Sequence, residues 1–117
     1  MLSTILIALT ALLHLYFLVL EMFLWDKPQG MKAFGSTPEF AKATKVLAAN
    51  QGLYNGFLAA GLIWALFITD PDWQRNVAVC FLLFVLVAGV YGAATASRRI
   101  LWVQAVPAII ALVAVHF

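Results

Sequence analysis

An acidic residue, Glu21, stands in one of the most apolar stretches of the sequence, HLYFLVLEMFLW at residues 14–25. That stretch contains no lysine or arginine, and His14 lies seven positions before the acid. A carboxyl group in apolar surroundings can bind and release a proton, and it can accept hydrogen bonds from a ligand. Seven residues of an α-helix rise about 10 Å, so His14 and Glu21 are too far apart to hold one metal ion together. Glu21 is therefore a candidate for ligand binding or proton exchange, and the spacing to His14 predicts no metal site.

Three other polar side chains share the helical face of Glu21. At about 100° per residue, the four residues fall within about 40° of one another on a helix. The residues of this stripe are Ser3, Thr10, His14 and Glu21. Aliphatic and aromatic residues occupy most of the remaining circumference. Because lipid cannot form hydrogen bonds with the stripe, we expect it to face protein.

Hydrogen-bonding side chains recur in the later apolar stretches. Counted inward from the predicted cytoplasmic end of each stretch, five hydrogen-bonding residues lie four to six positions deep: Glu21, Asn50, Gln51, Tyr91 and Gln104. This depth corresponds to about 6–9 Å of helix, with His14 and Asn55 deeper. We therefore expect a polar layer at one depth, with an opening to the cytoplasm. Its candidate ligand-binding residues are Glu21, His14, Asn50, Gln51, Tyr54, Asn55, Tyr91 and Gln104.

Two interpretations of Glu21 stay open. As a structural acid, it would accept hydrogen bonds from Asn50, Gln51 or Gln104 and fix the register of the helices. As a functional acid, it would be a protonatable binding site, which is the default expectation for an acid inside a membrane. Burial favours the neutral acid, whereas hydrogen bonds and a nearby arginine favour the carboxylate, so the sequence leaves both forms open. His14 is interpreted first as an interhelical hydrogen-bonding residue and second as a proton relay.

The composition indicates the class of protein. The chain has 117 residues, of which 65% are hydrophobic and 10% are charged, and its mean hydropathy is +1.00. A soluble domain is about half apolar and about a quarter charged, so the sequence predicts an integral membrane protein. The net charge of +2, without a basic tract, argues against nucleic-acid binding. Cys80 is the single cysteine, which excludes an intrachain disulfide, and the sequence contains no Gly-rich phosphate loop or other cofactor motif.

Four apolar stretches are long enough to cross a bilayer, which takes about 20 residues per helix. The predicted helices cover about 2–25, 38–69, 74–97 and 100–117. The second begins before the membrane at Pro38, with Thr37 or Ser36 as its N-cap. The segment DPD (70–72) is predicted to be a tight turn. The sequence thus predicts an all-α polytopic membrane protein, with one domain over residues 1–117 that forms a bundle of four transmembrane helices.

Basic residues are distributed unequally between the loops. The first and third loops contain Lys27, Lys32, Lys42, Lys45, Arg98 and Arg99. The second loop, on the opposite side of a four-span protein, is flanked by only one basic residue, Arg75. The positive-inside rule places the first and third loops in the cytoplasm, so both termini are expected outside.

Three motifs resemble a known family. The segments HLYFLVLEMFLW (14–25), KVLAANQGLYNGFLAAG (45–61) and GVYGAAT (89–95) are similar to those of the bacterial membrane-protein family catalogued as domain of unknown function 1304. The resemblance extends over nearly the whole chain, and the first two motifs are distinctive because such polar residues are unusual in membrane helices. It implies a small four-helix protein of the bacterial inner membrane. It supplies no activity, substrate or catalytic residue.

Three classes of function fit the sequence. The first is binding or transport of a small solute that exchanges with a proton on Glu21; a homodimer would then widen the narrow pathway that four helices provide. The second is a structural or accessory protein whose polar layer only fixes helix packing. The third is an intramembrane enzyme acting on a lipid-like molecule, with Glu21 as acid or base and His14 as its partner. Because the sequence offers neither a suitable nucleophile nor a metal cluster, the enzyme is the least favoured.

Overall fold

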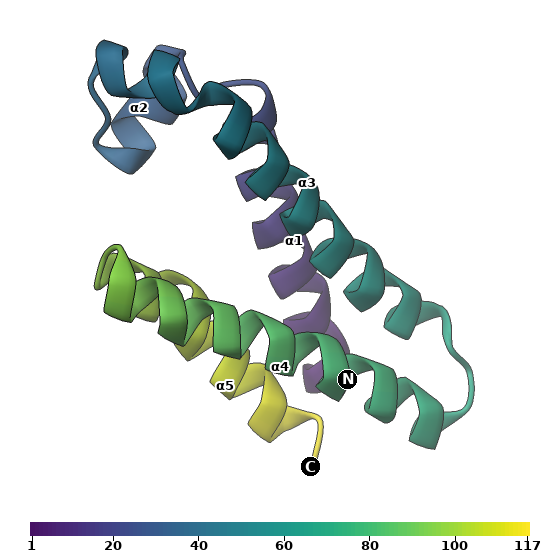
Figure 1. Ribbon diagram of the computed structural model, residues 1–117. Helices are drawn as coiled ribbons and strands as arrows, with labels where there is room; N and C mark the ends of the chain where they lie inside the picture. The colour runs from purple at the N-terminus through teal and green to yellow at the C-terminus, as the bar shows by residue number, and fades with distance from the viewer. The chain divides into compact units, whose positions relative to one another are not determined.

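The computed structural model describes all 117 residues of the chain, which form helices joined by short connections (Figure 1). In chain order the elements are α1 (Leu2–Met22), α2 (Pro28–Phe34), α3 (Pro38–Phe67), α4 (Pro71–Thr95), the π-helical segment η1 (Leu101–Ala105) and α5 (Val106–Ala114). No strand is present. The prediction of an all-α fold is therefore confirmed.

The chain forms two compact units. Unit 1 comprises Met1–Ala11 and Ala60–Phe117, and unit 2 comprises Leu12–Ala59. Unit 1 contains α4, η1 and α5 together with the beginning of α1 and the end of α3. Unit 2 contains the rest of α1, the whole of α2 and most of α3.

The first loop contains a helix, α2, that was absent from the sequence predictions. It begins at Pro28, which suits a first helical position because an N–H group there would have no partner within the helix. It is capped by Gly35, whose φ of 65° lies in the left-handed region that glycine adopts without strain. A Cβ atom on Gly30 would collide with the carbonyl oxygen of Leu24, so α2 packs directly against the chain leaving α1. The segment DKPQG (26–30) does not predict this helix, because proline and glycine are as typical of turns as of helix ends.

The helix α4 begins at Pro71, earlier than the predicted start at residue 74. The side-chain oxygen Oδ1 of Asp70 accepts hydrogen bonds from the backbone N–H groups of Asp72 at 2.9 Å and Trp73 at 3.2 Å. Asp70 is therefore an N-cap, and Pro71 occupies the first helical position. The segment predicted as a tight turn is thus the cap and first turn of a helix.

The last apolar stretch, predicted as one helix, is divided into η1 and α5. Pro107 has no backbone N–H, so the carbonyl of Val103 lacks its usual partner four residues later. Before this proline the helix widens, and the N–H of Val106 donates to the carbonyl oxygen of Leu101 in the π-helical pattern. A proline at this position thus accounts for the missing partner of Val103, but it does not by itself predict the wider π-helical turn.

Unit 1 has a core of small and aliphatic side chains. The buried members are Ile7, Ala11, Leu62, Ala65, Val77, Ala78, Leu82 and Ala111. Close backbone approach accompanies this core, since a Cβ atom on Gly89 would lie 3.0 Å from the backbone nitrogen of Ala105. The Nε of Arg75 donates to the carbonyl oxygen of Val115 at 3.3 Å, which connects the start of α4 with the end of α5.

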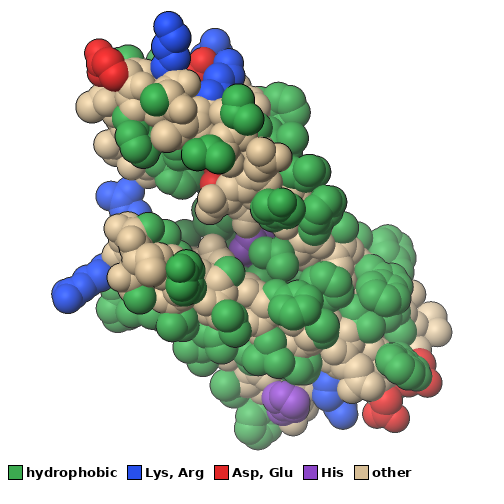
Figure 2. All heavy atoms as spheres, viewed as in Figure 1, with side chains coloured by type: hydrophobic (Ala, Val, Ile, Leu, Met, Phe, Trp, Pro, Cys, Tyr) green, Lys and Arg blue, Asp and Glu red, His purple; other side chains and the backbone are tan.

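Unit 2 has one polar end, where α2 and the start of α3 meet the chain leaving α1. Trp25 donates from Nε1 to Oγ1 of Thr44 at 3.0 Å, and its ring centroid lies 4.9 Å from that of Phe34. Lys45 forms an ion pair of 3.1 Å with Asp26. Lysine side chains gather at this end, whereas apolar side chains are prominent on the helices that continue from it (Figure 2).

We expect the ion pair between Asp26 and Lys45 to weaken in acid. The hydrogen bond from Lys45 holds the pKa of Asp26 below its ordinary value of 3.8. Because the pKa is lowered in the folded chain, the pair stabilises the fold above that value, and its contribution is lost as the pH falls through the lowered pKa. Asp26→Asn should therefore lower the melting temperature slightly at pH 7, as for a solvent-exposed pair, and the difference should shrink as the pH falls below 3.8. Thermal melts followed by circular dichroism measure this, and a constant difference across that range would contradict it.

Two helices are long and apolar enough to cross a membrane: α1, with 21 residues, and α4, with 25. The helix α3 is longer, with 30 residues, but its polar run NQGLYN (50–55) lowers its hydropathy. A shorter apolar helix covers Leu101–Ala114. Length and composition thus allow two spans, whereas the count of four spans and the orientation of the termini stay predictions.

Candidate functional site

The carboxyl group of Glu21 is buried and hydrogen-bonded within unit 2. Glu21 lies in the last turn of α1 and is 6% exposed. The amide Nδ2 of Asn55, which lies on α3, donates to Oε1 of Glu21 at 2.5 Å. The ion pair of unit 2 joins Lys45 to Asp26. No basic side chain of this unit forms an ion pair with Glu21. The acid therefore has an amide, not a charge, as its partner in this unit.

Two glycines of α3 allow this contact. A Cβ atom on Gly52 would lie 2.6 Å from Cγ of Met22 and 3.1 Å from Cβ of Glu21. A Cβ atom on Gly56 would lie 2.8 Å from Cδ1 of Leu18. Because neither glycine carries a side chain, the backbone of α3 comes close to α1. Asn55 is three positions after Gly52, about 60° away around the helix, and so it reaches the carboxyl group.

The remaining oxygen of the carboxyl group provides the chemistry of the site. Asn55 donates its hydrogen bond to Oε1 of Glu21, and this bond orients the Glu21 side chain. The other oxygen, Oε2, can carry a proton, release it or accept a hydrogen bond from a solute. No group of three or more His, Cys, Asp and Glu side chains is placed to hold a metal ion. The arrangement is suited to proton exchange or to recognition of a hydrogen-bond donor.

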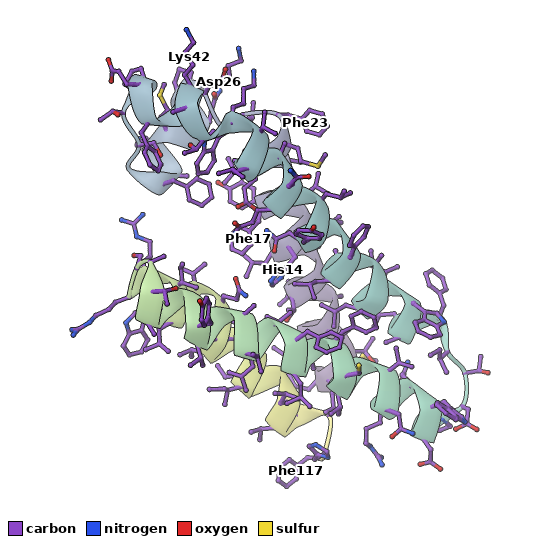
Figure 3. All side chains as sticks on the ribbon, in the orientation of Figure 1. His14, Phe17, Phe23, Asp26, Lys42 and Phe117 are labelled. Atoms are coloured by element: carbon purple, nitrogen blue, oxygen red, sulfur yellow. The ribbon has the colours of Figure 1, made fainter.

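The polar stripe predicted on α1 is buried along most of its length. Thr10, His14 and Glu21 are the buried polar or charged residues of the chain. His14 is completely buried, and its ring meets the ring of Phe17 edge-on, with the centroids 5.3 Å apart (Figure 3). Ser3, at the beginning of the stripe, is half-buried. The stripe residues are therefore buried in both units, Thr10 in unit 1 and His14 and Glu21 in unit 2.

The other candidate residues of α3 form no hydrogen bond with the carboxyl group. Asn50, Gln51 and Tyr54 are exposed on α3. As a structural acid, Glu21 was expected to pair with Asn50, Gln51 or Gln104, whereas its partner is Asn55. Asn50 misses the carboxyl because it lies about 160° around the helix from Gly52, on the side of α3 opposite α1.

The two candidate residues of unit 1, Tyr91 and Gln104, have different hydrogen-bond partners. Nε2 of Gln104 donates to the carbonyl oxygen of Val85 at 3.0 Å, which joins η1 to α4. Tyr91 is 71% exposed, and its carbonyl oxygen accepts a hydrogen bond from Oγ1 of Thr95. Gln104 thus satisfies a backbone group of the neighbouring helix. A single layer that joins all eight candidate residues stays a prediction.

Comparisons with known proteins identify relatives without an assigned function. A family described as "Protein of unknown function (DUF1304)" matches residues 8–116 of the chain. The "Uncharacterized protein YpaA" of Lactococcus lactis subsp. lactis (strain IL1403) is 31% identical over 118 residues, which cover 99% of this chain and 98% of the relative. No solved structure matches the chain. The matched region contains both Glu21 and Asn55.

Proposed function

This chain belongs to the DUF1304 family, described as proteins of unknown function, and on that premise we propose a function from its own residues. The protein crosses the membrane and binds a small cationic or hydrogen-bond-donating solute at Glu21, which gives up its proton when the solute binds. The observation that carries this proposal is the buried carboxyl of Glu21, held by the amide of Asn55 and facing no basic side chain within unit 2.

The proposed membrane location is supported by composition and by helix length. The chain is 65% hydrophobic, and both α1 and α4 have the length and apolarity of membrane spans. In α3, the 22 residues after Lys45, from 46 to 67, contain no charged residue. At a rise of about 1.5 Å per residue, this segment extends over about 33 Å, close to the hydrocarbon thickness of a bilayer.

The proposed exchange follows from the properties of a buried acid. An acid inside a membrane protein is costly unless it is neutral or paired. In the absence of solute, the proton on Glu21 removes the charge. A solute that brings a positive charge or an N–H donor can replace that proton, because it then provides the partner for the carboxylate. Asn55 keeps Oε1 fixed in both states, so Oε2 is the atom that exchanges its partner.

The test is proton release in vesicles that contain the purified protein and an internal pH-sensitive dye. The probes are guanidinium and methylammonium as cationic donors, and urea as a neutral donor. We expect a gradient of one of these solutes to drive proton movement with the wild type and not with Glu21→Gln, which keeps the shape but cannot titrate. Glu39→Gln is the matched control, because Glu39 is an exposed acid in the first turn of α3. Equal proton movement with Glu21→Gln and the wild type would overturn the proposal.

A purely structural role is the second candidate function. The close packing of Gly52 against Glu21 and Met22 favours it, because this contact alone would fix the register of α1 and α3. In that case the wild type shows no solute-dependent proton movement, and Glu21→Leu with Asn55→Leu leaves the protein folded and its cellular role intact. The same vesicles therefore separate the two candidates.

A further inference from the structure

A second polar surface lies on α3, mainly on the side that faces away from α1. Asn50 and Tyr54 are exposed on that side, with Tyr54 62% exposed, and Gln51 is exposed beside them, about 100° around the helix from Gly52. We refer to these three residues as the amide face. Asn50 and Tyr54 are four residues apart, so they lie one above the other on the helix. Both are more than about 150° around α3 from Gly52, the point of closest approach to α1.

In the proposed membrane location, the amide face lies in hydrocarbon. A spanning helix needs about 20 apolar residues, and 20 residues counted back from Phe67, where α3 ends, reach Ala48. Asn50 and Gln51 are therefore inside the span, about 3–5 Å beyond Ala48 along the axis. Polar side chains exposed at this depth lack hydrogen-bond partners in lipid, and membrane proteins satisfy such groups against another helix.

We propose that the amide face is a homodimer interface, in which α3 of one chain pairs with α3 of a second copy. Primary amides suit a two-fold interface because each has both a donor and an acceptor. The same face can therefore satisfy itself when residue i of one chain meets the equivalent residue of the other. The exposed rings of Tyr54 and Phe57, with centroids 5.9 Å apart, supply apolar contact beside the amides.

Lipid is a poorer occupant of this face than a second copy. Acyl chains offer no donor or acceptor to an amide, so lipid would leave both Asn50 and Gln51 unsatisfied. A second copy adds its own asparagine and glutamine, so the interface contains two of each. The inference rests on the proposed membrane location of α3, but it is independent of whether Glu21 exchanges a proton.

Cysteine crosslinking of the full-length protein in lipid vesicles tests the interface. The background is Cys80→Ala, since Cys80 is exposed and would otherwise react. Asn50→Cys and Tyr54→Cys place single thiols on the amide face, and Val87→Cys places one on an exposed position of α4 as the control. A disulfide forms only when the two Cα atoms come within about 7 Å, so crosslinking reports a specific contact.

We expect copper phenanthroline to convert the Asn50→Cys and Tyr54→Cys variants largely to covalent dimers and to leave the Val87→Cys variant monomeric. Equal crosslinking of all three variants would indicate random collision and overturn the proposal. Monomers of the Asn50→Cys variant that react rapidly with a water-soluble maleimide would also overturn it, because the face would then be in water. A monomer that neither crosslinks nor reacts would place lipid on the face and would contradict the dimer as well.

A second measurement does not depend on cysteine. Asn50→Leu with Gln51→Leu should raise the dimer dissociation constant in vesicles, measured by energy transfer between labelled chains. Interhelical hydrogen bonds in membranes contribute about three- to twentyfold each to association. An unchanged dissociation constant would contradict the proposal. Proton movement at Glu21 is measured on the same variant, and its retention alongside a weakened dimer supports an interface that is separate from the site.

Discussion

Replacing Asn55 with leucine is expected to destabilise the folded protein by about 1–3 kcal/mol, the usual cost of a buried polar group left without its partner. Asn55 provides the hydrogen bond to Oε1 of Glu21, and Glu21 is only 6% exposed. Leucine has a similar volume but no donor, so the carboxyl group loses its partner while the packing is retained. Unfolding followed by circular dichroism in mixed micelles with increasing dodecyl sulfate measures the loss.

A double-mutant cycle separates the lost hydrogen bond from general damage to α3. When Glu21→Leu accompanies Asn55→Leu, both partners are apolar, and the pair is expected to recover most of the stability. Asn76→Leu is a control for the asparagine substitution, since Asn76 is exposed on α4. If the double variant is as unstable as Asn55→Leu or more so, the contact between Glu21 and Asn55 does not account for the loss.

Gly52→Val is expected to destabilise the protein by about 1–3 kcal/mol through overpacking, and occasionally more. The first added carbon would lie 3.1 Å from Cβ of Glu21 and 3.2 Å from the carbonyl oxygen of Leu18. Met22 can move aside, but these two atoms are fixed by the α1 backbone, so the two helices must separate. Separation also lengthens the hydrogen bond to Asn55, and proton movement at Glu21 should therefore decrease in parallel.

The matched control for Gly52→Val is Ala60→Val on the same helix. Ala60 is exposed, so valine there alters the helix propensity and adds volume at the surface of the chain. We expect Ala60→Val to change the stability by less than about 0.5 kcal/mol, as for most surface substitutions. Equal losses for the two variants would show that valine in α3, and not the contact with α1, is responsible. Gly56→Ala should lie between them, because its neighbour is the mobile methyl Cδ1 of Leu18.

Much of the helical fold follows from local signals in the sequence. Apolar stretches indicated the helices, and Pro38 marked the start of α3 correctly. The same type of signal misled at residues 70–72, where an aspartate followed by proline fits both a turn and a helix cap. The helix α2 has only seven residues, too few to be stable alone in water, and it packs against Leu24, which is a tertiary contact. Sequence patterns alone do not contain that information.

The candidate site was predictable in part. The helical stripe identified the burial of His14 and Glu21, because residues seven apart return to the same face of a helix. The partner of Glu21 was not identified, because counting depth along each helix ignores how two helices cross. Gly52 and Gly56 determine the crossing of α1 and α3, and Asn55 lies between them. A search for polar residues beside close-packed glycines would have selected Asn55.

The central claim, that Glu21 and Asn55 are hydrogen-bonded inside the bilayer, is tested most directly by solid-state NMR of the protein in lipid vesicles. The measurement is the dipolar coupling between the carboxyl carbon of Glu21 and the amide nitrogen of Asn55, labelled with ¹³C and ¹⁵N. We predict a distance of about 3.5 Å, which corresponds to a hydrogen bond from the amide to one carboxyl oxygen, and no exchange of the Asn55 amide protons with bulk deuterium. Absence of measurable coupling, or rapid exchange of those protons with deuterated water, would contradict the account.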